Sequence, residues 1–197
     1  MRVLRLALLL TLVLGAMGWY AFYARVRASS QVPTDICFVA PATPYDPASG
    51  IAPDAPRVVP TNARCPVCGA FPSRVPEWAA QVIFSDGDAY FFDSPLSLFI
   101  YLRNLPRYAP SRTASEIAAS YVRATEGGQW IATNEAVYVQ GSSVPGPMRQ
   151  GNLPAFEDVM AARHFISRHG GTVLHSPDIT VQLLQNLAPT IHRADHA

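Results

Sequence analysis

The sequence contains no lysine and few charged residues of either sign. Its 15 basic residues are all arginine, its 14 acidic residues nearly balance them, and charged residues make up 15% of the 197 positions. A near-neutral chain without a basic stripe is not typical of nucleic-acid-binding proteins, so we expect no nucleic-acid partner. An apolar content of 49% also excludes a disordered charged tail.

Cysteine is scarce as well, and the common catalytic motifs are missing. Three cysteines are too few for a scaffold held by several disulfides and too few for a four-thiolate zinc site. The sequence shows no Ser/His/Asp arrangement, no phosphate-binding glycine loop and no dinucleotide-binding motif. We therefore expect that the protein is not an enzyme.

The N-terminus, in contrast, is strongly apolar. Residues 6–23 carry no charge and are flanked by arginines on both sides. This length reaches the lower limit for a membrane-spanning helix and exceeds the apolar stretch of a typical secretory signal. The pattern favours an uncleaved N-terminal membrane anchor over 1–28, with a cleaved signal as the alternative. Either segment directs the rest of the chain out of the cytoplasm.

Residues 29–60 have the composition of a linker. Prolines recur throughout this stretch, and they disfavour a regular helix and favour extended segments. Cys37 stands alone in it, and we interpret it as an incidental or packed thiol. The folded domain is expected over 61–180, followed by the end of a C-terminal helix and a polar tail over 181–197.

The expected domain contains two segments with the same order of elements. In the first, the Asp86-Gly87 hairpin signal joins two strands, and Ser94-Pro95 begins a helix. Two strand–strand–helix–strand (ββαβ) units in series predict an α+β fold whose helices cover one sheet face. The expected strands are 79–85, 88–92, 117–124, 136–140, 152–156 and 172–175, and the expected helices are 94–104, 157–168 and 177–187.

Two cysteines, Cys65 and Cys68, are separated by two residues just before the first hairpin. This spacing can place both sulfurs in one small volume. It suits a soft ion such as Cu(I), a dithiol–disulfide pair, half of a zinc knuckle, or a structural disulfide. Zinc is the least favoured because no second pair follows at knuckle spacing. A redox role is weakened because the pair precedes a hairpin and not a helix.

Met148 is the second candidate ligand. It follows Gly146-Pro147 in an expected loop, where a methionine has little to pack against and its thioether is a good Cu(I) ligand. Met160, in the middle of the second helix, is interpreted as a core residue. The aspartates around the first hairpin, Asp86, Asp88 and Asp93, are interpreted as turn and capping residues.

These motifs together resemble the NosL family of nitrous-oxide reductase accessory proteins over about 64–179. The resemblance rests on Cys65 to Gly69 (CPVCG), the Asp86-Gly87 turn and Phe91 to Ser94 (FFDS) in the first half. In the second half it rests on Gly146 to Met148 (GPM) and His169 to Leu174 (HGGTVL), in the same order and spacing.

The resemblance implies an exported, membrane-tethered Cu(I) protein that helps supply copper to nitrous-oxide reductase. A copper transporter and its periplasmic partner, or the recipient copper enzyme, are the implied partners, and the soluble domain is expected in the periplasm. The implied fold is a pair of related ββαβ units, similar to part of organomercurial lyase. Cys68 occupies the family's thiolate position, and Met148 the position of a second-motif thioether.

The chain departs from the family pattern at Ala70, where methionine is common, and at Arg149, where a small residue is usual. Its apolar helix also stands in place of a lipidated cysteine. We hypothesise a three-coordinate Cu(I) site of Cys65, Cys68 and Met148. Two alternatives stay open: a thiol–disulfide protein using Cys65 and Cys68, and a metal-free assembly scaffold.

Overall fold

The computed structural model describes residues 17, 19, 40–147 and 151–188. Residues 1–37 and 38–197 are separate units, and almost all of the first lies outside the described residues. The expected membrane anchor, 1–28, therefore lies outside them apart from Met17 and Trp19. In the part of the chain that the structure describes, no helix is both long and apolar enough to cross a membrane.

The first sheet is antiparallel, with strand order β2-β1-β3-β4. The Asp86-Gly87 turn joins its first two strands, and Gly87 has a φ of 84° there, in the region that favours glycine. Its strands are β1 (Ala80–Phe84), β2 (Ala89–Phe92), β3 (Ile117–Arg123) and β4 (Trp130–Ala132).

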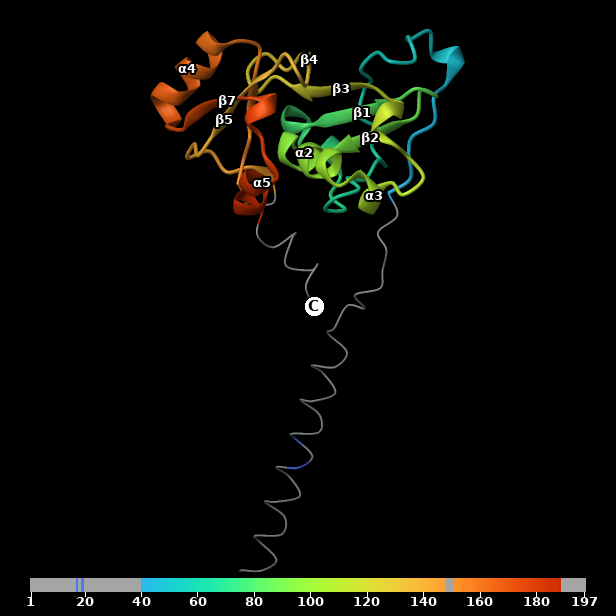
Figure 1. The fold of residues 1–197 in the computed structure, drawn as a ribbon, viewed down its shortest axis with the longest axis horizontal. Helices are drawn as coiled ribbons and strands as arrows, with labels where there is room; N and C mark the ends of the chain where they lie inside the picture. The colour runs from blue at the N-terminus through green and yellow to red at the C-terminus, as the bar shows by residue number, and fades with distance from the viewer. Residues whose placement is uncertain (1–16, 18, 20–39, 148–150, 189–197) are drawn as a thin grey trace, which may run out of the picture. The chain divides into compact units, whose positions relative to one another are not determined.

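The second sheet has the order β6-β5-β7, again antiparallel throughout. In both halves a hairpin is followed by a helix, and the strand after that helix pairs with the first strand on its free side (Figure 1). The predicted α+β class is therefore confirmed. The strands are β5 (Val137–Gln140), β6 (Ala155–Phe156) and β7 (Thr172–His175).

Four α-helices and several short 3-10 helices complete the described chain. Ser94 accepts a hydrogen bond from the Ser97 backbone and caps the first α-helix, and Asp158 caps the third in the same way. The α-helices are α2 (Pro95–Arg103), α3 (Leu105–Tyr108), α4 (Val159–His169) and α5 (Val181–Leu187). The 3-10 helices are η1 (Pro47–Ser49), η2 (Pro72–Arg74), η3 (Pro76–Trp78), η4 (Ala114–Glu116) and η6 (Ser176–Asp178).

Strand β1 is buried along its whole length because both faces of the first sheet are covered. Its residues Ala80, Val82 and Phe84 belong to the main hydrophobic core with α2. Ile83 points into a smaller cluster, against which Val59 and other residues before the cysteines pack. Successive side chains of a strand point to opposite faces of the sheet, so Ile83 lies on the other face from Val82 and Phe84.

The described part of the expected linker, 40–60, lies against this domain. Thr43 pairs with Ala89 at the edge of β2, and the Arg57 backbone exchanges two hydrogen bonds with the buried Gln81 side chain. The Tyr121 hydroxyl donates to the Asp54 carbonyl oxygen at 3.0 Å. The contact with Gln81 satisfies a buried polar side chain of the sheet, so this proline-rich segment forms part of the fold.

One hydrophobic core joins the two sheets. It includes Ala80 and Val82 from the first sheet, Tyr138 and Ala155 from the second, and Leu184 from α5. The ring of Phe99 on α2 packs edge-on against Tyr138, with centroids 5.2 Å apart. A second cluster beneath α4 is confined to the second half of the domain, around Phe156 and Phe165.

Candidate metal centre

The loop from Cys65 to Ala70 is closed by its own backbone. The Cys65 amide donates to the Ala70 carbonyl oxygen and the Gly69 amide to the Cys65 carbonyl oxygen, both at 2.8 Å. Gly69 has a φ of 73°, which other residues rarely adopt, so glycine allows the turn to close. A guanidinium N–H of Arg64 also donates to the Gly69 carbonyl oxygen at 3.1 Å.

This closed loop brings the two cysteines together as free thiols. Cys65 is completely buried and belongs to the main core, while Cys68 is partly exposed at its edge. The two sulfurs and a carboxylate oxygen of Asp93 all lie within 4.8 Å of one another. One sulfur of the pair is therefore held inside the protein and the other is open to an incoming group.

Asp93 was not among the predicted ligands, but the structure places its carboxylate beside the two sulfurs. It is only 2% exposed, at the end of β2, while the neighbouring Ser94 caps α2. An acidic residue inside a long apolar stretch, between Phe92 and Leu96, was the available sequence signal. Its partners were not visible, because the cysteines lie far from it along the chain.

The environment of Cys65 keeps its thiol protonated. Burial raises the pKa of Cys65 well above the usual value, and its hydrogen bond to Cys68 and the charge of Asp93 act in the same direction. A backbone hydrogen bond from Asp93 opposes these effects. Reactive redox cysteines have lowered pKa values, so this direction does not support thiol–disulfide exchange, and Cys65 must lose its proton if it binds a metal ion.

Two stacked tyrosines lie beside the cysteine pair. Tyr101 and Tyr108 stack with ring centroids 6.0 Å apart, and both belong to or pack against the core that contains Cys65. Burial raises the pKa of Tyr108, and charge on Cys65 and Cys68 raises it further. The site is thus apolar on its inner side, where electrostatic interactions are stronger than in water.

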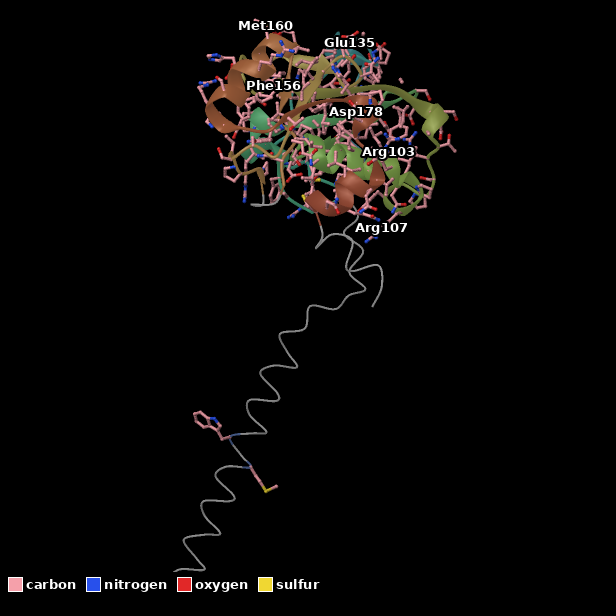
Figure 2. The ribbon with its side chains drawn as sticks, turned by 60° about the vertical axis from the view of Figure 1, so that its left-hand side comes forward. Arg103, Arg107, Glu135, Phe156, Met160 and Asp178 are labelled. Carbon is pink, nitrogen blue, oxygen red and sulfur yellow. The ribbon has the colours of Figure 1, made fainter. Side chains whose placement is uncertain are left out.

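Two sequence predictions about methionines have different outcomes. Met148 lies outside the described residues, so its role as a ligand stays a prediction. Met160 is 73% exposed on the outer surface of α4 (Figure 2), so its interpretation as a core residue is wrong. On α4 the buried positions are Ala162 and Phe165, which face the second cluster.

The fold and the site define an α+β protein with a two-thiol centre, in which one thiol is buried and the other is partly exposed. The NosL family model matches residues 56–184, and the chain therefore belongs to the NosL family. A search among curated proteins gives no match.

Two solved structures are similar to the chain. The crystal structure of the copper chaperone NosL from Shewanella denitrificans has a TM-score of 0.54 and 21% identity, covering 66% of this chain and 99% of that chain. The solution NMR structure of apo-NosL from Achromobacter cycloclastes has a TM-score of 0.40 and 28% identity, covering 53% and 87%. Membership of the NosL family agrees with the prediction that this protein is not an enzyme.

Proposed function

We propose that this protein is an exported Cu(I) chaperone that holds the ion between Cys65 and Cys68. The observation that carries the proposal is the pair of thiols, one buried and one partly exposed, whose sulfurs lie within 4.8 Å of each other and of Asp93. Thiolates are soft donors that suit Cu(I), whereas the Asp93 carboxylate is a hard donor that suits it poorly. We therefore assign the two sulfurs, and not the Asp93 carboxylate, as the copper ligands.

The different exposure of the two cysteines supports a transfer role. Cys65, inside the core, holds the ion, and Cys68 faces the side from which an acceptor ligand approaches. Cu(I) has a filled d shell and tolerates low coordination, so an acceptor sulfur can bind before a Cys68 bond breaks. We include the Met148 thioether as a third ligand, on the sequence motif alone.

Membrane tethering and the recipient are further parts of this proposal. The uncharged run over 6–23 supports a single-pass anchor, with the domain held in the periplasm. Membership of the NosL family supports nitrous-oxide reductase, or a related copper enzyme, as the recipient, and a copper transporter and its periplasmic partner as further partners. Retention of the full chain in membranes after an alkaline wash tests the anchor, and release into the wash would contradict it.

An anaerobic Cu(I) titration of the full chain in detergent micelles, against a competing chelator, tests the copper site. We expect one tight equivalent for the wild type and its loss in the Cys65→Ser/Cys68→Ser double variant. Cys37→Ser is the matched control, because it removes the third thiol and leaves the pair intact. Absence of competitive binding in the wild type, or retention of binding in the double variant, would overturn the proposal.

A further inference from the structure

The first sheet is incomplete along the outer side of β3. This strand runs from Ile117 to Arg123, but β4 pairs only with its last three residues. In the described part of the chain, no strand pairs with Ile117 to Ala119 on that side. The opposite edge of the sheet, in contrast, is continued by the bridge between Thr43 and Ala89. The start of β3 therefore presents an open strand edge.

A groove with a volume of about 380 Å³ lies along this open edge. The small residues Ala118 to Ser120 line it on β3, and their short side chains leave the strand backbone within reach of a ligand. Leu102 of α2 and Tyr121 add apolar surface, while Asn134 and Ser176 add an amide and a hydroxyl group. None of the described lining residues is charged, so the groove itself suits a polypeptide backbone.

The backbone of β3 is irregular at the centre of this edge. Ala119 lies opposite Ile83 of β1, and Ile117 lies opposite the next β1 residue, Phe84. Ala118 is therefore the additional residue of a bulge, and it is exposed. No strand residue of the described chain stands opposite Ala118 on either side, so an added segment can supply hydrogen-bond partners for its backbone.

Three acidic residues stand next to the groove. Glu116 precedes β3, Glu135 lies just after β4, and Asp178 ends η6. Figure 2 shows Glu135 and Asp178 on the same face of the domain. Burial raises the pKa of Tyr121, and the charges of Asp54 and Glu135 raise it further, so Glu135 lies near the groove lining.

The arginines nearest to the groove in the sequence have partners. The Arg103 guanidinium donates to the Ile179 carbonyl oxygen at 3.1 Å. Arg112, ahead of η4, forms ion pairs with both Asp86 and Asp88. Because these two carboxylates balance Arg112, the three acidic residues next to the groove are opposed by the single charge of Arg103. The surroundings of the groove are therefore net negative.

We propose that this groove binds an extended segment of a partner protein that carries arginine or lysine side chains. The backbone of the segment pairs with the open start of β3, and these main-chain hydrogen bonds provide affinity. Alternate side chains of an extended segment point the same way, so basic residues two positions apart together face the acidic side of the groove. This inference goes beyond the copper function and does not depend on it, because no described lining residue belongs to the loop from Cys65 to Ala70.

A second copy of this chain suits the groove less well. Two copies joined through β3 would bring the same acidic residues together, and like charges across an interface are unfavourable. The bulge at Ala118 also limits regular pairing to a few residues, whereas a sheet shared between two copies needs a longer run. A short basic segment satisfies both constraints.

The test uses a fluorescein-labelled peptide of four Arg-Val repeats, titrated with the full chain in micelles of an uncharged detergent. Fluorescence anisotropy measures the affinity. At low salt we expect saturable binding at one site, at least about tenfold tighter than the binding of a peptide of four Glu-Val repeats. A rise from about 20 to 300 mM NaCl should weaken the binding of the Arg-Val peptide, because salt screens the exposed charges.

Two pairs of variants locate the binding site. Ala118→Trp fills the groove and should weaken binding of the Arg-Val peptide at least about tenfold, whereas Ala118→Ser should keep the affinity within about twofold of the wild type. Glu135→Arg should weaken binding by about fivefold. Glu77→Arg makes the same change of charge on η3 and should bind the peptide as the wild type does. Because Glu135 is exposed, its variant decides the question even where Ala118→Trp disturbs the fold.

The opposite results would overturn the proposal. It fails if the wild type shows no saturable binding, if the acidic peptide binds equally well, or if Glu135→Arg keeps the wild-type affinity. Sedimentation tests the second copy as occupant: a dimer that Ala118→Trp abolishes and that does not bind the peptide would make the groove an interface between copies. None of these outcomes bears on the copper site, which the Cu(I) titration tests separately.

Discussion

At the scale of single residues, the two cysteines are unequal although they belong to one short motif. Cys65 is buried in the hydrophobic core and Cys68 is at its edge. Burial raises the pKa of Cys65, so its proton must leave when a metal ion binds. The spacing of the motif predicts that the two sulfurs lie close together. It does not predict that one cysteine is buried and the other partly exposed.

The raised pKa of Cys65 predicts a pH dependence of copper affinity. Below that pKa the free thiol is protonated and the copper complex is not, so Cu(I) binding releases a proton. Lowering the pH should therefore weaken binding by about tenfold per pH unit for each proton released. Competition titrations at pH 6.5, 7.5 and 8.5 measure the slope. An affinity that does not change across this range would show that Cys65 does not bind the ion.

Replacement of Met148 tests the remaining predicted ligand. Met148→Leu keeps the size and apolar character of the side chain and removes the sulfur, so we expect Cu(I) affinity to fall by roughly tenfold, or about 1.4 kcal/mol. Met160→Leu is the matched control, because Met160 is exposed on α4. Equal affinities for Met148→Leu and the wild type would remove Met148 from the ligand set.

The sequence predicts the site only as far as local pattern allows. The CPVCG motif indicates a close pair of sulfurs, and the loop that closes at Gly69 provides it. Asp93 could not be placed from the sequence, because its contact with the cysteines depends on how β2 packs beside their loop. The surroundings of a side chain that depend on contacts between distant segments cannot be predicted from the periodicity of the sequence.

At the scale of elements, α5 fastens the C-terminal part of the domain to the core that contains Cys65. Leu184 of this helix is 1% exposed and packs in that core, and the Gly151 amide donates to the Leu187 carbonyl oxygen at 3.2 Å. A Cβ at position 151 would approach the Leu187 carbonyl oxygen at 2.8 Å, so glycine permits the close contact.

Truncation of Leu184 tests this role of α5. Leu184→Ala should lower the free energy of unfolding by about 2–5 kcal/mol, because it removes buried apolar volume and leaves a cavity. Val181→Ala on the same helix is the control: Val181 is 49% exposed, and we expect a change of about 0.5 kcal/mol or less. Urea unfolding followed by circular dichroism gives both values, and equal losses in the two variants would show that α5 is not docked through Leu184.

The elements themselves were predictable because their signals are local. Ser94-Pro95, the Asp86-Gly87 turn and the apolar spacing of α2 all indicate structure over a few residues, and each element forms near its expected bounds. Strand β4 and helix α3 were not predicted, since both are short and form through pairing or packing with distant elements.

At the scale of the whole molecule, the two ββαβ halves share a core and should behave as one cooperative domain. The main hydrophobic core contains residues of both sheets, and Thr125 donates to the Ala155 carbonyl oxygen across the junction at 2.8 Å. Repetition of the same element order in sequence is equally compatible with two independent units. The contacts between the halves, among them the packing of Phe99 of the first half on Tyr138 of the second, distinguish these possibilities.

The positions of the tryptophans allow this cooperativity to be measured. Trp78 and Trp130 lie in the first half, on η3 and β4, and the second half contains no tryptophan; Trp19, the third tryptophan, precedes the domain and is replaced by Phe in the proteins compared. Phe156→Ala removes a ring from the second half, where it packs 5.0 Å from the Phe165 ring, and should cost about 3–5 kcal/mol. In one cooperative domain this loss lowers the urea midpoint seen by tryptophan fluorescence as much as the midpoint seen by circular dichroism. A fluorescence midpoint that stays at the wild-type value would instead show two halves that unfold separately, and the shared core would then contribute little to stability.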